Sequence, residues 1–305
     1  KVWCTMKKIV VCDSIDAAAI KALSQVFDVV DKSRVSRQEL LEAIADADCV
    51  IVRSRTKVDR EFLEKASKLK VIARPGVGLD NVDSSEANRR GIKLLNTPEA
   101  PTNAAAELTI GLLLALFRGI VRGDRGIRRG EWLKNELLGE ELSGKTLGVI
   151  GYGRIGRQVG KLAVCLGMRV LAWDILGETI NYAPATYTPL EELLSQADAV
   201  TLHVPLTPET KGFFNAEMLS KIKRGAYLVN ASRGEVLDED ALYRALKEGW
   251  IRGAALDVFS SEPYTGPLTQ LDNVVLTPHI GANTKEAQRK AAIQIVELIT
   301  RELGG

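Results

Sequence analysis

Three side chains that could carry acid–base and anion chemistry each follow a short apolar run near the carboxyl end of the chain. Arg233 follows AYLVN, Glu262 follows GAALDV, and His279 follows VVLT. An imidazole can take a proton from a hydroxyl group, and a carboxylate on its other ring nitrogen stabilises the imidazolium. A guanidinium binds a carboxylate through paired hydrogen bonds. The three residues predict hydride transfer from a hydroxy acid, with His279 as base, Glu262 as its partner and Arg233 as the carboxylate ligand.

A glycine-rich segment, LGVIGYGRIG, predicts where a second reactant binds. Gly151, Gly153 and Gly156 have the spacing GxGxxG, after an apolar strand pattern and before a helical one. The next apolar run ends at Asp174, 18 residues after Gly156. Strand, glycine turn, helix, strand and acid are the layout of a dinucleotide-binding unit, in which the acid hydrogen-bonds the ribose hydroxyls and repels a 2′-phosphate. We therefore expect NAD rather than NADP; the alternative is a glycine-rich turn in some other α/β protein.

Strand and helix patterns alternate along the chain, which predicts two doubly wound parallel-sheet α/β domains. The predicted strands are residues 8–12, 27–30, 49–53, 71–73, 92–95, 146–150, 168–173, 199–204, 226–230, 253–258 and 274–277. The predicted helices are residues 15–26, 36–44, 60–67, 103–119, 157–166 and 284–301. The helix at 103–119 is too apolar to face water, so we expect it to be buried between domains or subunits.

Composition excludes several classes of function. Lys and Arg total 41 and Asp and Glu total 39, so the formal charge of +2 favours neither a nucleic-acid nor a membrane partner. The chain has two histidines and no CxxC pair, which predicts no metal site and four free thiols, at Cys4, Cys12, Cys49 and Cys165. The apolar run at the amino end is interrupted by Asp13 and is too short for a signal peptide, so we expect a cytoplasmic enzyme.

Long motifs in a fixed order run through nearly the whole chain. They are VRSRTKV (52–58), ARPGVGLDNVD (73–83), NTPEAPTNAAAEL (96–108), LSGKTLGVIGYGRIG (142–156), HVPLTPET (203–210), NASRGEVLDEDAL (230–242), GAALDVFSSEP (253–263) and TPHIGANTKEAQ (277–288). By these motifs the chain resembles the D-2-hydroxyacid dehydrogenases, and within that family it is most similar to the branch that oxidises 3-phosphoglycerate.

The resemblance implies a domain plan and an assembly. Residues 1–97 and 283–305 would form a flavodoxin-like substrate domain, and residues 98–282 a Rossmann cofactor domain. It implies a homodimer built around the helix after Asn103, and it assigns the catalytic roles to Arg233, Glu262 and His279. The chain ends soon after its last helix, whereas many relatives continue into a serine-binding regulatory domain. We therefore expect a short form without serine feedback through such a domain.

The predicted cofactor site collects the glycine turn and the ends of the later strands. Its residues are Gly151, Gly153, Arg154, Ile155, Gly156, Asp174, His203, Pro205, Thr210, Ala231, Ser232, Asp257 and Gly281. His203 has no acidic or basic partner nearby in the sequence, so we assign it to lining the cofactor pocket rather than to catalysis.

The predicted substrate site lies in the first domain. Arg53, Ser54 and Arg74 match positions that hold the substrate phosphate in phosphoglycerate-oxidising relatives. The backbone N–H groups of Gly76, Val77 and Gly78 are candidates for binding the substrate carboxylate. The sequence departs from the family pattern with a proline at position 75 and an added charge at position 55. The alternative is that the two arginines are structural ion-pair residues.

These predictions converge on NAD-dependent oxidation of 3-phospho-D-glycerate to 3-phosphohydroxypyruvate, the entry step of serine biosynthesis. A nearer alternative is another dehydrogenase of the family, which reduces glyoxylate or hydroxypyruvate. A more distant one is an NAD(H)-responsive binding protein, because transcriptional corepressors share this fold and triad.

Overall fold

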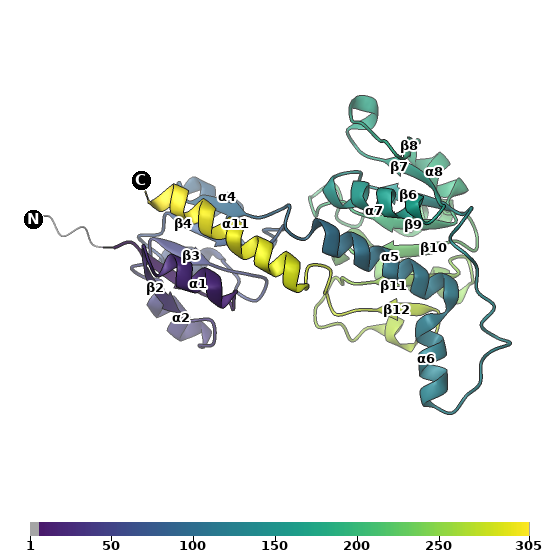
Figure 1. The fold of residues 1–305 in the computed structure, drawn as a ribbon, viewed down its shortest axis with the longest axis horizontal. Helices are drawn as coiled ribbons and strands as arrows, with labels where there is room; N and C mark the ends of the chain where they lie inside the picture. Colours follow the sequence, from purple (N-terminus) through teal and green to yellow (C-terminus); the bar gives the residue numbers. More distant parts are fainter. Residues whose placement is uncertain (1–5, 305) are drawn as a thin grey trace, which may run out of the picture. The chain divides into compact units, whose positions relative to one another are not determined.

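The computed structural model describes residues 6–304, and these residues form two compact units (Figure 1). Unit 1 contains the described residues up to Pro101 and those from Ala282 onward, and unit 2 is Thr102–Gly281. The boundaries predicted for the substrate and cofactor domains, after residues 97 and 282, lie beside these transitions. Cys4, predicted to be a free thiol, lies outside the described residues.

Unit 1 is built on a five-stranded parallel sheet with the order β2-β1-β3-β4-β5. Its strands are β1 (Lys8–Val11), β2 (Asp28–Asp31), β3 (Cys49–Ile51), β4 (Val71–Arg74) and β5 (Lys93–Asn96). Its helices are α1 (Ala17–Leu23), α2 (Arg37–Ala43), α3 (Arg60–Lys65), α4 (Ser84–Arg89) and α11 (Lys285–Leu303). This strand order is that of the flavodoxin-like fold, as predicted.

Apolar side chains point alternately to the two faces of the sheet along the central strands of unit 1, so both faces are covered by helices. Ile9 and Val11 point to one side and pack with Ile295 of α11, whereas Val10 points to the other and packs with Phe62 of α3. The last helix, yellow in Figure 1, lies against α1, β4 and β5. The carboxyl end of the chain therefore covers the sheet that the amino end forms.

Unit 2 contains a seven-stranded parallel sheet with the order β12-β11-β10-β9-β6-β7-β8. Its strands are β6 (Thr146–Ile150), β7 (Arg169–Trp173), β8 (Thr186–Tyr187), β9 (Ala199–Leu202), β10 (Tyr227–Asn230), β11 (Gly253–Leu256) and β12 (Val274–Leu276). Its helices are α5 (Thr102–Arg118), α6 (Ile120–Arg128), α7 (Arg154–Cys165), α8 (Leu190–Gln196), α9 (Ala216–Lys221) and α10 (Glu239–Lys247), with short 3₁₀ turns at Gly177–Thr179, Gly234–Val236 and Pro267–Gln270. The arrangement of strands on either side of β6 is of the Rossmann type, which confirms the predicted fold class.

The apolar helix α5 is covered mostly within unit 2. We expect its surface to be buried between domains or subunits; most of it is covered within unit 2, Leu114 is 37% exposed, and burial against a second subunit stays a prediction. Leu113 is fully buried and Phe117 is 2% exposed, and both belong to a core shared with Val159 of α7 and Val229 of β10. Figure 1 shows α5 and α7 side by side on the sheet. The helix is apolar because it packs on both a sheet face and a second helix.

Some element boundaries also differ from the predictions. Helix α7 begins at Arg154 rather than at residue 157, because Gly153 takes the extended N-cap conformation directly before it. The sequence patterns missed α4, α6, α8, α9 and α10, which are six to nine residues long. Such short helices bury at most three side chains each, so their apolar periodicity is weak.

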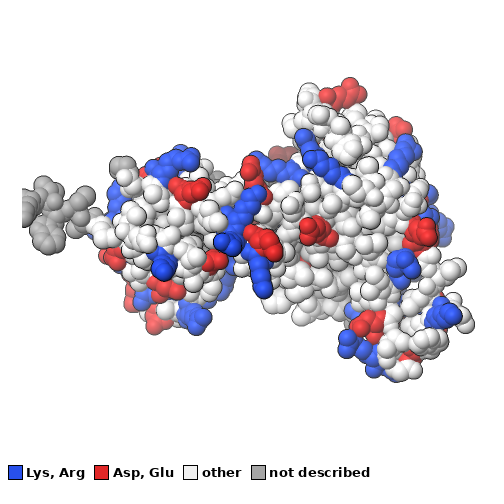
Figure 2. All heavy atoms as spheres, viewed as in Figure 1, with Lys and Arg blue, Asp and Glu red and all other residues white. Residues whose placement is uncertain are grey.

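The surface has no region of one charge on the face shown in Figure 2, where Lys and Arg are interspersed with Asp and Glu. Within residues 6–304, three cysteines are free and no group of three or more His, Cys, Asp or Glu side chains could hold a metal ion. In the same part of the chain no single helix is long and apolar enough to cross a membrane. Helices α5 and α6 together have the length and composition of a membrane span, but they are bent by 64° at the break between them.

Candidate active site

The three predicted catalytic residues follow three neighbouring strands of unit 2. Arg233 follows β10, Glu262 follows β11 and His279 follows β12, and these strands are adjacent in the order β12-β11-β10. Because all three are parallel, their carboxyl ends meet at one edge of the sheet. Parallel α/β sheets bind their ligands beyond this edge.

Glu262 and His279 form a direct pair. Nδ1 of His279 lies 2.8 Å from Oε2 and 3.1 Å from Oε1 of Glu262. A carboxylate can only accept, so Nδ1 donates and Nε2 keeps the lone pair that can take a proton. The side chains are 45% and 39% exposed, so the ring can be reached by a small molecule. His279 has φ 53°, a left-handed conformation uncommon outside glycine that often marks functional positions.

A buried carboxylate holds the segment that carries His279. Asp257 is 1% exposed, and its Oδ1 accepts from Thr277 Oγ1 at 2.6 Å and from Ile280 N at 2.9 Å. Its Oδ2 accepts from Gly281 N at 2.8 Å. These contacts bracket His279 on both sides, and they account for its unusual backbone. Asp257 and Gly281 were predicted to bind the cofactor; in the structure they hold the His279 segment, and the cofactor role stays a prediction.

The loops after β10 and β11 are in backbone contact, which brings the Arg233 segment against the Glu262 segment. A Cβ added to Gly234 would lie 1.8 Å from the carbonyl carbon of Phe259 and 2.4 Å from Ser260 N. Only glycine allows this approach. Glu239 Oε1 then accepts from Ser260 N at 2.7 Å, which ties the start of α10 to the same loop.

The sequence prediction missed Asn230, which shapes the Arg233 loop. Its Oδ1 accepts from Ser232 N at 3.1 Å and from Ser232 Oγ at 2.8 Å, and its Nδ2 donates to the Arg233 carbonyl at 3.0 Å. Asn230 is fully buried at the end of an apolar strand. A polar residue at that position is the signal that could have identified it.

The glycine turn fits a dinucleotide because its three glycines have different neighbours. A Cβ on Gly151 would lie 2.5 Å from the His203 carbonyl oxygen, and one on Gly156 would lie 2.1 Å from the Gly151 oxygen. A Cβ on Gly153 meets no described atom within 4 Å, and Gly153 caps α7 without a side-chain hydrogen bond. Open space beside the bare start of a twelve-residue helix suits a pyrophosphate.

Asp174 is placed to receive the ribose. Its Oδ2 accepts from Tyr152 N at 2.8 Å and its Oδ1 from Leu176 N at 3.1 Å. A carboxylate has about four acceptor sites, so two remain for hydroxyl groups. The glycine turn and His203 follow the neighbouring strands β6 and β9, where the strand order reverses. Burial lowers the pKa of His203 to about 3, so this ring is neutral and does not serve as an acid.

The predicted cofactor residues Pro205 and Thr210 form one tight turn. Thr210 Oγ1 donates to the Pro205 carbonyl at 2.6 Å and accepts from Thr207 N at 2.8 Å. Ala231 and Ile155 are half-buried, and Arg154 is exposed at the start of α7. All of these residues belong to unit 2, and their contact with a cofactor stays a prediction.

In unit 1 the predicted phosphate-binding loop is held by residues that the sequence prediction missed. The buried Asp13 accepts from Arg53 N at 2.5 Å and from Thr56 Oγ1 at 2.7 Å, and it pairs with Arg55 Nε at 3.1 Å. Asn81 Nδ2 donates to the carbonyls of Arg53 and Thr56, at 2.6 Å each. The added charge at position 55 is therefore matched by a buried carboxylate, while Ser54 remains exposed.

The second predicted arginine ends β4, the strand next to β3. Arg74 is half-buried, and its guanidinium lies against Gly76. The structure corrects one detail of the predicted carboxylate site, because the N–H of Gly76 donates to Thr97 Oγ1 at 2.8 Å. That group is already used within the chain. The prediction of a carboxylate site on this loop therefore rests on Val77 and Gly78.

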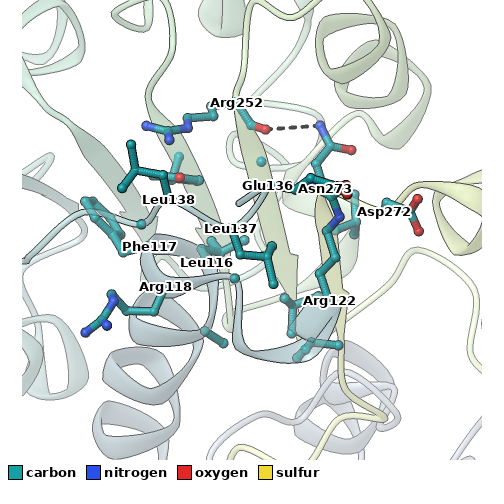
Figure 3. A pocket seen from close by; sticks show the side chains of 18 residues that line it. Leu116, Phe117, Arg118, Arg122, Glu136, Leu137, Leu138, Arg252, Asp272 and Asn273 are labelled. Atoms are coloured by element: carbon teal, nitrogen blue, oxygen red, sulfur yellow. Dashed lines mark hydrogen bonds and ion pairs between the residues drawn. The ribbon is translucent and has the colours of Figure 1, made fainter. Parts of the chain in front are cut away.

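A cavity of about 180 Å³ in unit 2 lies away from all of these residues. Figure 3 shows it beside the carboxyl end of α5, with Arg118, Arg122 and Arg252 among its lining residues. Its wall includes Tyr227, Gly253 and Val274, the first residues of β10, β11 and β12. These are the amino ends of the strands, and the triad lies at their carboxyl ends.

Unit 2 is a dinucleotide-binding α/β domain, as its Rossmann-type sheet, its glycine turn before α7 and Asp174 after the next strand indicate. The acid–base pair Glu262 and His279 lies at the same edge of the sheet. Residues 110–281 match the model of the D-isomer specific 2-hydroxyacid dehydrogenase NAD-binding domain. The chain belongs to this family, which confirms the resemblance inferred from its motifs, and its cofactor is NAD.

Relatives within the family differ in their named reactions. The chain is 48% identical, over 98% of its length, to D-3-phosphoglycerate dehydrogenase of Methanocaldococcus jannaschii, but it spans only 58% of that protein. It is 43% identical, over 96% of its length, to hydroxypyruvate reductase of Thermotoga maritima, of which it spans 97%. Among solved structures it is similar to the TT0316 protein of Thermus thermophilus, with a TM-score of 0.88, 39% identity and 97% coverage of each chain.

Proposed function

We propose that this protein oxidises 3-phospho-D-glycerate to 3-phosphohydroxypyruvate with NAD, the first step of serine biosynthesis. The observation that carries the choice of substrate is a pair of half-buried arginines in unit 1: Arg53 follows β3, and Arg74 ends the neighbouring strand β4. Two guanidinium groups suit a doubly charged phosphate, which offers more acceptors than a carboxylate alone. The identity to a phosphoglycerate dehydrogenase supports the same choice.

The proposed chemistry assigns one task to each residue of the triad. NAD held at the glycine turn and Asp174 would supply the acceptor for the hydride that leaves C2 of the acid. Nε2 of His279 accepts the hydroxyl proton, and Glu262 at 2.8 Å stabilises the imidazolium that results. Arg233 binds the carboxylate and polarises the oxygen on C2. In the reducing direction the same imidazolium returns its proton to the carbonyl oxygen.

A second candidate is reduction of hydroxypyruvate or glyoxylate. The observation in its favour is the relative from Thermotoga maritima, because the chain covers 97% of that protein, which is named for the unphosphorylated substrate. The two candidates share the fold, the cofactor and the triad. They differ only in whether the phosphate contributes to recognition.

The test is NADH oxidation with 3-phosphohydroxypyruvate, hydroxypyruvate and glyoxylate in one buffer. We expect kcat/KM to favour the phosphorylated acid by about a hundredfold, or about 2.7 kcal/mol. Arg74→Ala should remove most of this advantage, whereas Arg60→Ala, which changes an exposed arginine paired with Glu64, should not. Equal values for the three acids in the wild-type protein would make it a general reductase of 2-keto acids.

We also propose that the protein is a homodimer, as the family resemblance implies. Most of the apolar surface of helix α5 is covered within unit 2, and Leu114 is left 37% exposed. Exposed apolar side chains on the following segment, Ile127 at 58% and Trp132 at 78%, support a contact there. Sedimentation equilibrium tests this, and a monomer at micromolar concentration contradicts it.

A further inference from the structure

The loop after β4 is held by the end of β5. Gly76 N donates to Thr97 Oγ1 at 2.8 Å, and the Gly76 carbonyl accepts from Thr97 N at 2.9 Å. Thr97 is 1% exposed, so these two bonds are shielded from water. Asn96 Nδ2 donates to the Val77 carbonyl at 2.7 Å. The backbone of residues 76–77 is therefore tied in place by three hydrogen bonds from one neighbouring segment.

A side chain at position 76 would meet the guanidinium of Arg74. An added Cβ would lie 2.9 Å from Nη1 and 3.6 Å from Cζ of Arg74, and it meets no other described heavy atom within 4 Å. Contacts below 3.0 Å are essentially never found for a real Cβ. Because the loop backbone is tied and the guanidinium ends a flexible side chain, the arginine is the group that would move.

We propose that Gly76 is a specificity-determining residue for the phosphorylated acid: its missing side chain is what allows the Arg74 guanidinium to lie against the chain at position 76. This inference rests on the proposed function and deepens it. Gly76 acts through Arg74 rather than by donating its own N–H, which Thr97 already uses. Arg53, Pro75 and Gly76 line one cavity of about 50 Å³ in unit 1, so the first arginine lies near the loop that directly follows the second. A methyl group at position 76 would displace one of the two cations that recognise the phosphate.

The test is a double-mutant cycle of Gly76→Ala and Arg74→Ala. The measured quantity is the ratio of kcat/KM for 3-phosphohydroxypyruvate to kcat/KM for hydroxypyruvate, with NADH as reductant. We expect Gly76→Ala to lower this ratio by about tenfold or more when Arg74 is present, the usual loss for one charge-assisted hydrogen bond. With Arg74→Ala in place, the same change should alter the ratio by less than about threefold.

Backbone strain needs a separate control, because Gly76 has φ +149°. Gly91 has φ +71° in the same unit, and a Cβ there meets no described atom within 4 Å. Gly91→Ala therefore carries the strain of a positive φ without touching Arg74, and it should leave the ratio unchanged. Thermal unfolding and NADH binding should show that each variant is folded.

The outcomes distinguish a failure of the Gly76 inference from a failure of the proposed function. An equal fall in the ratio with and without Arg74, or no fall in a folded Gly76→Ala protein, overturns the inference and leaves the proposed function standing. If Gly76→Ala folds only when Arg74 is also removed, the contact is supported; if it fails to fold in both backgrounds, the backbone bears the clash and the inference is wrong. A wild-type protein with no preference for the phosphorylated acid removes the proposed function and this inference together.

Discussion

Gly234→Ala tests whether the active-site edge of unit 2 depends on one backbone contact. An alanine Cβ at this position would lie 1.8 Å from the Phe259 carbonyl carbon, where ordinary contacts are at least 3.4 Å. The atoms on both sides belong to the backbone, so no rotamer change relieves the clash. The loops that carry Arg233 and Glu262 must then separate by more than an ångström.

Two magnitudes follow from this separation. Overpacking a core costs about 1–3 kcal/mol when side chains can adjust, and a clash between backbones belongs at the upper end, about 3 kcal/mol. Misplacing catalytic groups by about 1 Å costs on the order of a hundredfold in turnover. We therefore expect the folded Gly234→Ala protein to lose both stability and kcat, with the loss in kcat persisting well below its unfolding temperature.

The assay combines urea unfolding with steady-state NADH oxidation. Gly111→Ala is the matched control, because Gly111 lies within α5 and its added Cβ meets no described atom within 4 Å. That change should raise stability by up to about 1 kcal/mol through helix propensity and should leave kcat unchanged. A Gly234→Ala protein with wild-type stability and turnover would refute the reasoning from the Phe259 contact.

Three further changes probe the cofactor and proton-transfer residues. Gly153→Ala should change the free energy of unfolding by no more than about 1 kcal/mol. It should raise the Kd for NADH at least tenfold, because its Cβ enters the space left for the pyrophosphate. An unchanged Kd in a fluorescence titration counts against that placement of the pyrophosphate. His279→Gln should lower kcat by ~10²- to 10⁴-fold with NADH affinity preserved, and a variant with full turnover removes this residue from proton transfer. Burial lowers the pKa of His203 from 6.5 to about 3, so the unfolded chain binds a proton in that window that the folded chain does not. Stability should fall as the pH drops from about 6.5 towards 3, and between pH 7 and pH 4 the wild type should lose about 3 kcal/mol more than His203→Gln; equal losses in urea titrations would contradict this.

The chemistry at the strand ends could be predicted from the sequence because residues that follow adjacent parallel strands meet at one edge of the sheet. Apolar runs followed by Arg233, Glu262 and His279 predicted parallel strands with a shared edge, and the adjacency of β10, β11 and β12 brings these residues to one side. The motif order then predicted the family. Both inferences use patterns that lie close in the sequence to each functional side chain.

The residues that hold the site in place could not be predicted in this way, because their partners are distant in the chain. Asp13 holds Arg53, which lies 40 residues further along, and Asp257 holds Gly281, 24 residues away. No local pattern distinguishes such a carboxylate from one that binds a ligand. The sequence predicts a cofactor contact for Asp257, and it gives no sign of the three bonds that the Asp257 oxygens accept from the His279 segment.

The reason for glycine at a given position is also hidden in the sequence. From the sequence alone, the glycines of GxGxxG and Gly76 have the same interpretation, because each would let the backbone approach an anion. The space around each absent side chain separates them. Gly151 and Gly156 are required by the chain's own backbone, which lies within 2.5 Å and 2.1 Å of their missing Cβ atoms, whereas Gly153 faces open space and Gly76 faces only Arg74. Packing therefore explains the first two. Gly153 has no such contact, which leaves ligand recognition as the reason for glycine there, whereas Gly76 combines a positive φ of 149° with its contact to Arg74.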